Sequence, residues 1–216
     1  MKKTDMTHKA AEIIELLRKE YPEVKCALIY EEPHELLIAT RLSAQCTDKR
    51  VNMVTPALFR RFPTVDAFAQ ADISEVEELI KTCGLFHTKA ADIVNMCAML
   101  RDIYGGRVPD EIDELVKLPG VGRKTANLIV GDLYGKPAFV CDTHVIRLTN
   151  RIGLCKGKDP LQVEKQMRAI IPAEEGLQLC HRLVWHGRGV CAARSPECGR
   201  CVLNGICTYY NSNNHK

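Results

Sequence analysis

Four cysteines near the C-terminal end of the chain have a spacing typical of a metal centre. Their pattern is C-x6-C-x2-C-x5-C, and the segment also contains two glycines that permit tight turns. Four thiolates so close in sequence can converge on one centre, and the two centres that suit them are zinc and an iron–sulfur cluster. Zinc sites more often use two C-x2-C pairs, whereas only one pair here is tight. The spacing therefore favours a cluster over zinc and over four free thiols; the expected ligands are Cys191, Cys198, Cys201 and Cys207.

Three arginines lie in or beside the cysteine segment, against a single acid. They are Arg188, Arg194 and Arg200, and the acid is Glu197. A metal centre would tie down a tail with little apolar core of its own, which is a folding role. The basic loop held in this way can contact phosphates, or it can be an ordinary solvated surface.

A glycine-containing turn, Leu118-Pro-Gly-Val-Gly-Arg-Lys-Thr-Ala-Asn127, lies between two expected helices. Pro119 and Gly120 force a sharp turn, and Gly122 leaves its backbone amide open. Amides at the N-terminus of the following helix, together with the helix dipole, bind a phosphate oxygen. The alternative is a plain turn between helices, but the neighbouring Arg123 makes the pattern more specific. We therefore expect this hairpin to contact a nucleic-acid backbone.

Lys124 lies in the first turn of the helix that follows the hairpin. The helix dipole disfavours a cation there by about 0.3–1 kcal/mol. This penalty shifts the lysine toward its neutral form, and a neutral amine is a nucleophile whereas an ammonium is not. Lys124 is therefore a candidate nucleophile. The alternative is a charged lysine that pairs with phosphate.

Asp142 lies eighteen residues after Lys124, in the stretch Val140-Cys-Asp-Thr-His-Val145. Its position predicts the N-cap of a helix. A capping carboxylate at the mouth of a cleft can also stabilise positive charge on a sugar as a base departs, or accept the proton of an attacking amine. If the carboxylate lies close to Lys124, it favours the charged lysine and opposes the dipole.

Helical signals follow one another along the whole chain. Apolar residues recur at helical spacing from Ala10 to Tyr21. Helices are also expected over 35–42, from 48, from 65, over about 88–104, 111–117, 123–134 and 145–151, from 160, and from 172 to about 187. The expected N-caps are Thr47, Thr64, Ser74, Asp110, Asp142 and Asp159. No period-2 strand pattern occurs, so the expected fold class is all-α, and Pro137 marks a crossing between two lobes.

The composition is that of an ordinary globular protein. Hydrophobic residues make up 46% of the 216 residues, and the formal net charge of +3 permits a nucleic-acid partner without demanding one. No apolar run approaches the roughly 20 residues of a membrane span, and Asp5, Glu12 and Glu15 interrupt any export signal. Seven of the eleven cysteines are scattered outside the C-terminal cluster, which fits a reducing cytosol.

Taken together, these motifs resemble those of the endonuclease III family, and the resemblance covers nearly the full length of the chain. The segments that carry the resemblance are Leu42-Ser-Ala-Gln-Cys-Thr-Asp48, Gly84-Leu-Phe-His-Thr-Lys-Ala90, the hairpin, Asp142-Thr-His144, His186-Gly-Arg188 and the cysteine set. The resemblance implies a six-helix domain over 26–136, with a helix-hairpin-helix at about 112–131. It also implies an iron–sulfur domain formed by 1–25 and 137–216, with DNA bound in the cleft between the lobes. The cysteine spacing is that of the family's [4Fe–4S] loop.

The resemblance also implies individual roles. Lys124 matches the lysine that attacks the sugar C1′ and forms a Schiff base, after which β-elimination breaks the strand, and Asp142 matches the essential aspartate. Gln45 matches the residue that fills the gap left by a flipped base, and Leu85 lies on a matching wedge loop. From their sequence context alone, Gln45 is equally a surface residue and Leu85 equally a core residue. The full set of expected DNA contacts is Gln45, Leu85, Gly120, Gly122, Arg123, His144 and Arg194.

The sequence therefore predicts a base-excision-repair DNA glycosylase with AP-lyase activity that removes oxidised pyrimidines. The expected partner is duplex DNA with a damaged pyrimidine or an abasic site, bound by a monomer in the bacterial cytoplasm, at the nucleoid. One alternative is an adenine-mismatch glycosylase; members of that group lack the hairpin lysine and carry a further C-terminal domain, whereas this chain ends nine residues after Cys207. Another is a non-catalytic helix-hairpin-helix module with a structural metal. Lys124 and Asp142 together argue against it. Phe86 and His87 leave the preferred lesion open.

Overall fold

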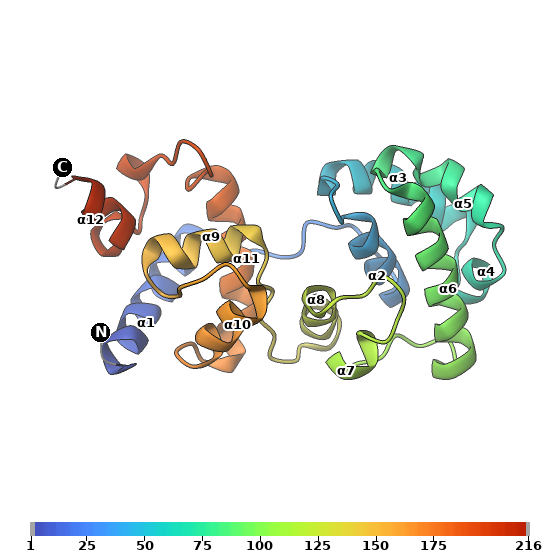
Figure 1. Ribbon diagram of the computed structural model, residues 1–216, viewed down its shortest axis with the longest axis horizontal. Coiled ribbons are helices and arrows are strands. Elements are labelled where there is room, and N and C mark those ends of the chain that lie inside the picture. The colour runs from blue at the N-terminus through green and yellow to red at the C-terminus, as the bar shows by residue number, and fades with distance from the viewer. Residues whose placement is uncertain (1–2, 215–216) are drawn as a thin grey trace. The chain divides into compact units, whose positions relative to one another are not determined.

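The computed structural model describes residues 3–214, which form helices and connecting turns with no strand within that range (Figure 1). The predicted all-α class is confirmed. The chain divides into two compact units. One runs from Cys26 to Gly135, and the other joins the N-terminal segment up to Lys25 with the chain from Lys136 onward. Each unit has its own core. No helix among the described residues is long and apolar enough to cross a membrane.

The unit over 26–135 is built around a buried central helix, α2. The helices of this unit are α2 (Pro33–Leu42), α3 (Asp48–Arg61), α4 (Val65–Ala69), α5 (Ile73–Ile80), the 3₁₀ turn η1 (Lys81–Cys83), α6 (Phe86–Tyr104), α7 (Ile112–Leu115) and α8 (Arg123–Tyr134). Leu36, Leu37 and Ile38 are fully buried, because α2 packs against α3, α6 and α8. A helix covered on several sides must be apolar nearly all round, as this one is.

Helix starts in this unit follow side-chain capping. Thr47 and Thr64 cap α3 and α4 as predicted, each accepting a hydrogen bond from the backbone N–H three residues later. The prediction of Ser74 as a cap is wrong. Asp72 caps α5, because its carboxylate accepts hydrogen bonds from both the backbone N–H and the hydroxyl of Ser74 at 2.8 Å. The prediction of Asp110 as a cap is also wrong, since Glu111 precedes the single turn of α7.

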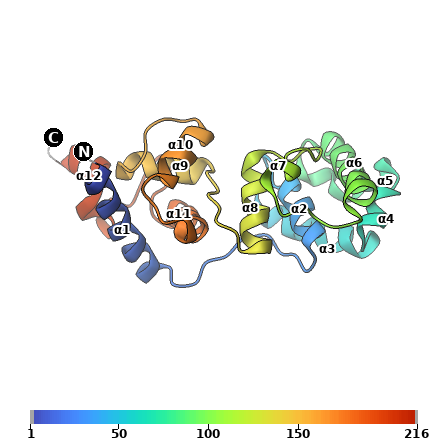
Figure 2. The same cartoon turned by 90° about the horizontal axis from the view of Figure 1, so that it is seen from below.

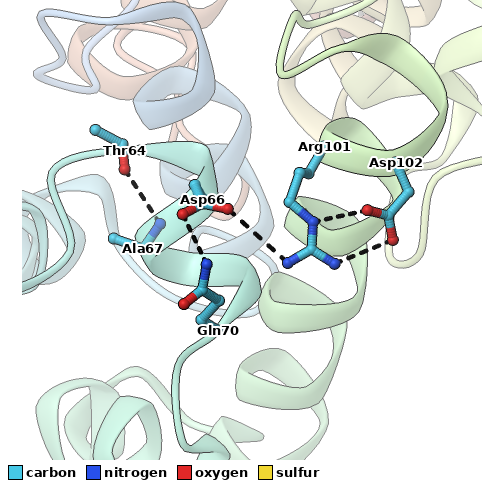
Figure 3. A network of polar contacts seen from close by, with 6 residues as sticks. All are labelled: Thr64, Asp66, Ala67, Gln70, Arg101 and Asp102. Atoms are coloured by element: carbon cyan, nitrogen blue, oxygen red, sulfur yellow. Dashed lines mark hydrogen bonds and ion pairs between the residues drawn. The ribbon is translucent and has the colours of Figure 1, made fainter.

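Helices α4 and α6 are joined by a surface network of polar side chains (Figure 3). Asp66 in the first turn of α4 accepts a hydrogen bond from Gln70 at 2.7 Å and lies 3.9 Å from the Arg101 guanidinium of α6. Arg101 also pairs with its neighbour Asp102 at 2.7 Å. Such exposed pairs add little to stability. The α4–α6 contact is therefore held mainly by apolar packing, in which Phe68 is fully buried.

The second unit consists of α1 (Lys3–Glu20), α9 (Thr143–Ile152), α10 (Pro160–Arg168), the 3₁₀ turn η2 (Ala173–Glu175), α11 (Gly176–Gly189), the 3₁₀ turns η3 (Cys198–Arg200) and η4 (Asn204–Ile206), and α12 (Thr208–Asn214). Helix α1 packs against α11 through an apolar stripe that includes Ile13 and Leu17. Figure 2 shows α12, which the sequence analysis missed, at the same end of this unit as the start of α1. There Lys9 Nζ donates to Thr208 Oγ1 at 3.2 Å.

Candidate active site and metal centre

The hairpin between α7 and α8 rests on a half-buried ion pair. Gly120 has a φ of +74°. A Cβ atom there would lie 2.5 Å from Arg41 Nε and 2.8 Å from Asp92 Oδ2. Arg41 and Asp92 themselves bond at 2.6 Å with side chains only 13% and 23% exposed. Only glycine fits this position, because the backbone conformation and the close approach both exclude a side chain. Gly122, by contrast, has open space around it.

The first turn of α8 presents the candidate phosphate site. Gly122 is the N-cap of α8, and Gly122, Arg123 and Lys124 are all exposed. The first backbone amides of a helix have no partner within the helix, so they point outward with the positive end of the dipole. Lys124 therefore extends from a helix start whose open amides suit an anion. That the helix dipole favours the neutral form of the Lys124 amine stays a prediction.

Two loops of the same unit carry the remaining candidate contacts. Gln45 and Leu85 have φ values of 54° and 50°, and they are the non-glycine residues with positive φ in the described chain. Leu85 is 56% exposed, so its interpretation as a core residue is wrong. Gln45 is also exposed. Residues in this strained region persist only where the surrounding structure holds them, and such residues cluster at functional sites.

In the second unit, Asp142 caps α9 as predicted. Its Oδ1 accepts a hydrogen bond from the backbone N–H of Val145 at 2.8 Å, and the side chain is half-buried. One carboxylate oxygen is thus used by the helix start, which fixes the direction of the group. A fixed and partly accessible carboxylate is what a role in substrate chemistry needs, so the capping role and a catalytic role are compatible.

His144 is the second residue of α9 and packs against α11. Arg147 Nη2 lies 3.1 Å from its Nδ1 and also donates to the carbonyl of Gly187 at 3.0 Å. A Cβ atom on Gly187 would come within 2.9 Å of His144 Nδ1, so the glycine permits this close packing. Burial lowers the pKa of His144, against an opposing effect of the Asp142 charge. The imidazole is therefore neutral near pH 7 and offers one donor and one acceptor.

The four C-terminal cysteines line a single pocket. Its walls also include the side chains of Leu148, Ile152 and Leu203. Within the described residues, no three His, Cys, Asp or Glu side chains converge closely enough to hold one metal ion. Four sulfurs around one pocket fit a polynuclear centre, whose iron atoms each take one thiolate. The donor set thus suits an iron–sulfur cluster.

Hydrogen bonds to these sulfurs come from residues that the sequence analysis did not identify. Arg151 Nη1 donates to Cys191 Sγ at 3.3 Å, and His186 Nε2 lies 3.2 Å from Cys201 Sγ. Tyr21 directly follows α1, and its hydroxyl lies 3.1 Å from the other ring nitrogen of His186. Groups of this kind orient the ligands of a metal centre. No local pattern marks them, because their partners are distant in sequence.

The arginines of the cysteine segment differ in how they are held. Arg200 forms an ion pair with Glu197 and donates to the Gly189 carbonyl at 2.6 Å. Arg151, from α9, donates to the carbonyls of Ala192 and Ala193 at 2.7 Å and so shapes the loop. Arg194 is exposed. Arg194 is the better candidate for contact with phosphate, because Arg151 and Arg200 already form hydrogen bonds that hold the segment.

Two models of protein families match this chain. Residues 38–173 match the model of the HhH-GPD superfamily base excision DNA repair proteins, and residues 191–207 match the iron–sulfur binding domain of endonuclease III. Endonuclease III of Synechocystis sp. is 46% identical over 200 residues, which cover 92% of this chain and 91% of the relative.

Two solved structures are also similar. A non-covalent endonuclease III–DNA complex has a TM-score of 0.92 and 41% identity, with all of both chains covered. A trapped endonuclease III–DNA covalent intermediate has a TM-score of 0.91, with 41% identity and 99% of each chain covered.

Proposed function

The chain belongs to the endonuclease III family, and on that basis we propose that it removes oxidised pyrimidines from duplex DNA with Lys124 as the nucleophile. It is a base-excision-repair DNA glycosylase with lyase activity, it acts on duplex DNA, and it carries an iron–sulfur cluster. The neutral amine of Lys124 attacks C1′ of the damaged nucleotide as the base leaves. The resulting Schiff base withdraws electrons from the sugar, and β-elimination then breaks the strand on its 3′ side.

Lys124 is supported as the nucleophile by its place in the fold. It extends from a helix start whose backbone amides and dipole suit a phosphate group. We propose that Gly120 and Gly122 bring these amides to the DNA backbone and that Arg123 adds charge. The hairpin then fixes the register of the DNA while the lysine reaches the sugar. The Arg41–Asp92 ion pair packs against Gly120 and so fixes the position of the hairpin.

Asp142 is proposed to act on the same deoxyribose. Its carboxylate stabilises the positive charge that develops on the sugar as the base leaves, and it accepts the proton released by the attacking amine. The hydrogen bond from the Val145 backbone N–H holds one carboxylate oxygen in place. The orientation of the other oxygen is therefore set before the reaction begins. This role requires Asp142 and Lys124 to reach one nucleotide in the DNA complex.

The remaining contacts divide by position. Gln45 and Leu85 are proposed to enter the duplex, where they fill the space of the flipped nucleotide and separate its neighbours. Their exposure and positive φ support this. His144 and Arg194 are proposed to contact the DNA backbone from the second unit. Gln45 and Leu85 belong to the unit over 26–135, so the proposed DNA contacts come from both units.

The four cysteines are proposed to ligate a [4Fe–4S] cluster. Arg151 and His186 orient the sulfurs, and the bound cluster supplies a rigid cross-link for a segment that has few apolar contacts. The enzyme itself is proposed to be a monomer that works at the nucleoid in the bacterial cytoplasm, where its substrate lies.

Borohydride trapping on abasic-site duplex DNA tests the proposal, because it reduces a Schiff base to a stable covalent bond. Wild-type protein should give a trapped complex, and Lys124→Ala should give none. Lys117→Ala is the matched control: it removes an exposed lysine before the same hairpin, where it pairs with Glu114 at 2.7 Å. It should trap DNA nearly as well as wild type. Trapping by Lys124→Ala at the wild-type level would overturn the assignment. A panel of oxidised pyrimidines in the same assay identifies the preferred lesion.

A further inference from the structure

The two loops proposed to enter the duplex each carry a cysteine that the reaction does not use. Cys46 directly follows Gln45, and Cys83 lies two residues before Leu85. Gln45 and Leu85 are the two residues with strained, left-handed backbone conformations. A covalent bond between the two cysteines would therefore act on a backbone that has little freedom to adjust.

A buried lysine joins the bases of these loops. Lys89 is fully buried, and its Nζ donates to the carbonyl of Leu42 at 2.8 Å and to that of Cys83 at 2.6 Å. Leu42 is the last residue of α2, immediately before the loop that contains Gln45 and Cys46. Helix α3, which begins two residues after Cys46, also packs against η1, in which Cys83 lies. The two loops are therefore in contact.

The two thiols meet at this contact. Cys83 is 1% exposed and Cys46 is half-buried. Burial raises the pKa of Cys83 to about 11, with further contributions from negative charge at Cys46 and from a hydrogen bond between the two side chains. The nearby Lys89 ammonium opposes this effect and favours a thiolate at Cys83. The site thus holds an accessible thiol, a sheltered thiol and a cation.

The other cysteines outside the metal centre lack this combination. Cys97, Cys141, Cys155 and Cys180 are buried, so a dissolved oxidant does not reach them. Cys26 is half-buried, and the groups that shift its pKa include no cysteine. Cys46 is thus the accessible thiol with a second thiol beside it.

We propose that Cys46 and Cys83 are an oxidation site, at which a low-molecular-weight disulfide of the glutathione type converts the two thiols into a disulfide. The Cys46 thiolate attacks one sulfur of the oxidant, forms a mixed disulfide and releases one thiol. The Cys83 thiolate then attacks the Cys46 sulfur and releases the second thiol. The pair loses two electrons and two protons, and the oxidant is reduced to two thiols.

The disulfide draws the two loops together. An S–S bond of about 2.05 Å is shorter than any non-bonded contact between two sulfurs, so the bond brings the two side chains closer and constrains the loops that carry Gln45 and Leu85. This consequence rests on the proposed role of those two residues in DNA binding. Oxidation should then weaken binding of abasic-site duplex by about 5–150-fold, the usual range for coupling between two sites. A reductant should restore it.

The test uses the cluster-containing protein with oxidised glutathione. Free thiols are alkylated after treatment, and peptide mass mapping is expected to find a Cys46–Cys83 cross-link. Affinity for abasic-site duplex and borohydride trapping are measured on the reduced, oxidised and re-reduced protein. The visible absorption of the cluster is followed throughout, and it should stay constant.

Three variants separate the outcomes. Cys46→Ser and Cys83→Ala should bind DNA like the reduced wild type and show no response to the oxidant. Cys97→Ala, which removes a buried thiol from α6, should respond like wild type. The inference is overturned if no cross-link forms, or if the cross-linked protein binds DNA as tightly as the reduced one. If reduced wild type fails to trap abasic DNA, the proposed function is overturned instead, and mapping alone still decides the thiol chemistry.

Discussion

The hairpin at residues 118–124 and the cysteine segment at residues 191–207 are both short loops with glycines and basic side chains, but different forces hold them. The hairpin lies on the Arg41–Asp92 pair and is flanked by the buried residues Leu118 and Val121. In the cysteine segment, Leu203 is buried while most side chains are half-buried or exposed. The hairpin is thus positioned by packing and by the ion pair beneath it. The cysteine segment is held by hydrogen bonds from Arg151 and Arg200, and we expect it to depend on its metal centre as well.

The difference between the hairpin and the cysteine segment has a chemical reason. A nucleophile must be placed within a fraction of an ångström of the reacting atom, and rigid packing supplies this. A loop that contacts only phosphates has a less exact task, and a metal centre can hold it without an apolar core. The hairpin and the cysteine segment thus reach rigidity by separate routes, which the following substitutions can separate.

The largest effect is expected from Cys198→Ser. Loss of one of four ligands should remove the cluster and unfold the segment over 191–207, with a destabilisation of more than about 4 kcal/mol. Visible absorption and protease sensitivity measure the two losses. Cys155→Ala, in the same unit but outside the pocket, should keep the cluster. A variant without a cluster but with a protease-resistant tail would show that protein contacts suffice here too.

Asp142→Asn should reduce base removal by about 10²–10⁴-fold, because the amide keeps the shape but not the charge. Asparagine caps helices about as well as aspartate, so the free energy of unfolding should change by less than about 0.5 kcal/mol. The matched control is Asp159→Asn, since Asp159 caps α10 with a bond of the same 2.8 Å length. Equal turnover in the two variants would reduce Asp142 to a cap. Single-turnover kinetics and denaturant unfolding make the measurement.

Gly120→Ala should destabilise the protein by about 1–3 kcal/mol, because the new methyl group meets Arg41 and Asp92 at a positive φ. It should also reduce trapping by displacing the hairpin. Gly122→Ala is the contrast: its φ is −94° and the added atom meets open space, so stability should change by less than about 1 kcal/mol. Similar unfolding midpoints for both would contradict the account of how the hairpin is supported.

The smallest effect is expected from Arg194→Ala. Loss of one phosphate contact should lower the slope of log affinity against log salt by about 1, uniformly across DNA sequences. Stability should not change, because the side chain is exposed. Glu197→Gln, which frees Arg200 from its ion pair in the same segment, provides the comparison. An unchanged salt slope in Arg194→Ala would assign this arginine to the solvated surface.

Sequence reasoning located most helices because their signals are local. Thr47, Thr64, Asp142 and Asp159 each bond to a backbone N–H within three residues, so a short window contains the whole interaction. The cap prediction at Ser74 was wrong because the nearby Asp72 accepts the backbone N–H of Ser74. The cap prediction at Asp110 was wrong because α7 begins after Glu111, whose side chain makes no capping hydrogen bond. Helix α7 is shorter than predicted because the chain turns after the buried Leu115 to enter the hairpin.

The identity of the chemical groups was determined by the sequence alone, since four cysteines, a lysine after a glycine turn and a capping aspartate are each visible as local patterns. The supports of those groups were decided only by the tertiary structure. Arg41 lies under Gly120, Arg151 bonds to the cysteine segment, and Lys89 joins the loops of Cys46 and Cys83. Each of these contacts joins residues dozens of positions apart or depends on the burial of a charge. The spacing of residues within a short stretch of sequence predicts neither a distant contact nor the burial of a charge.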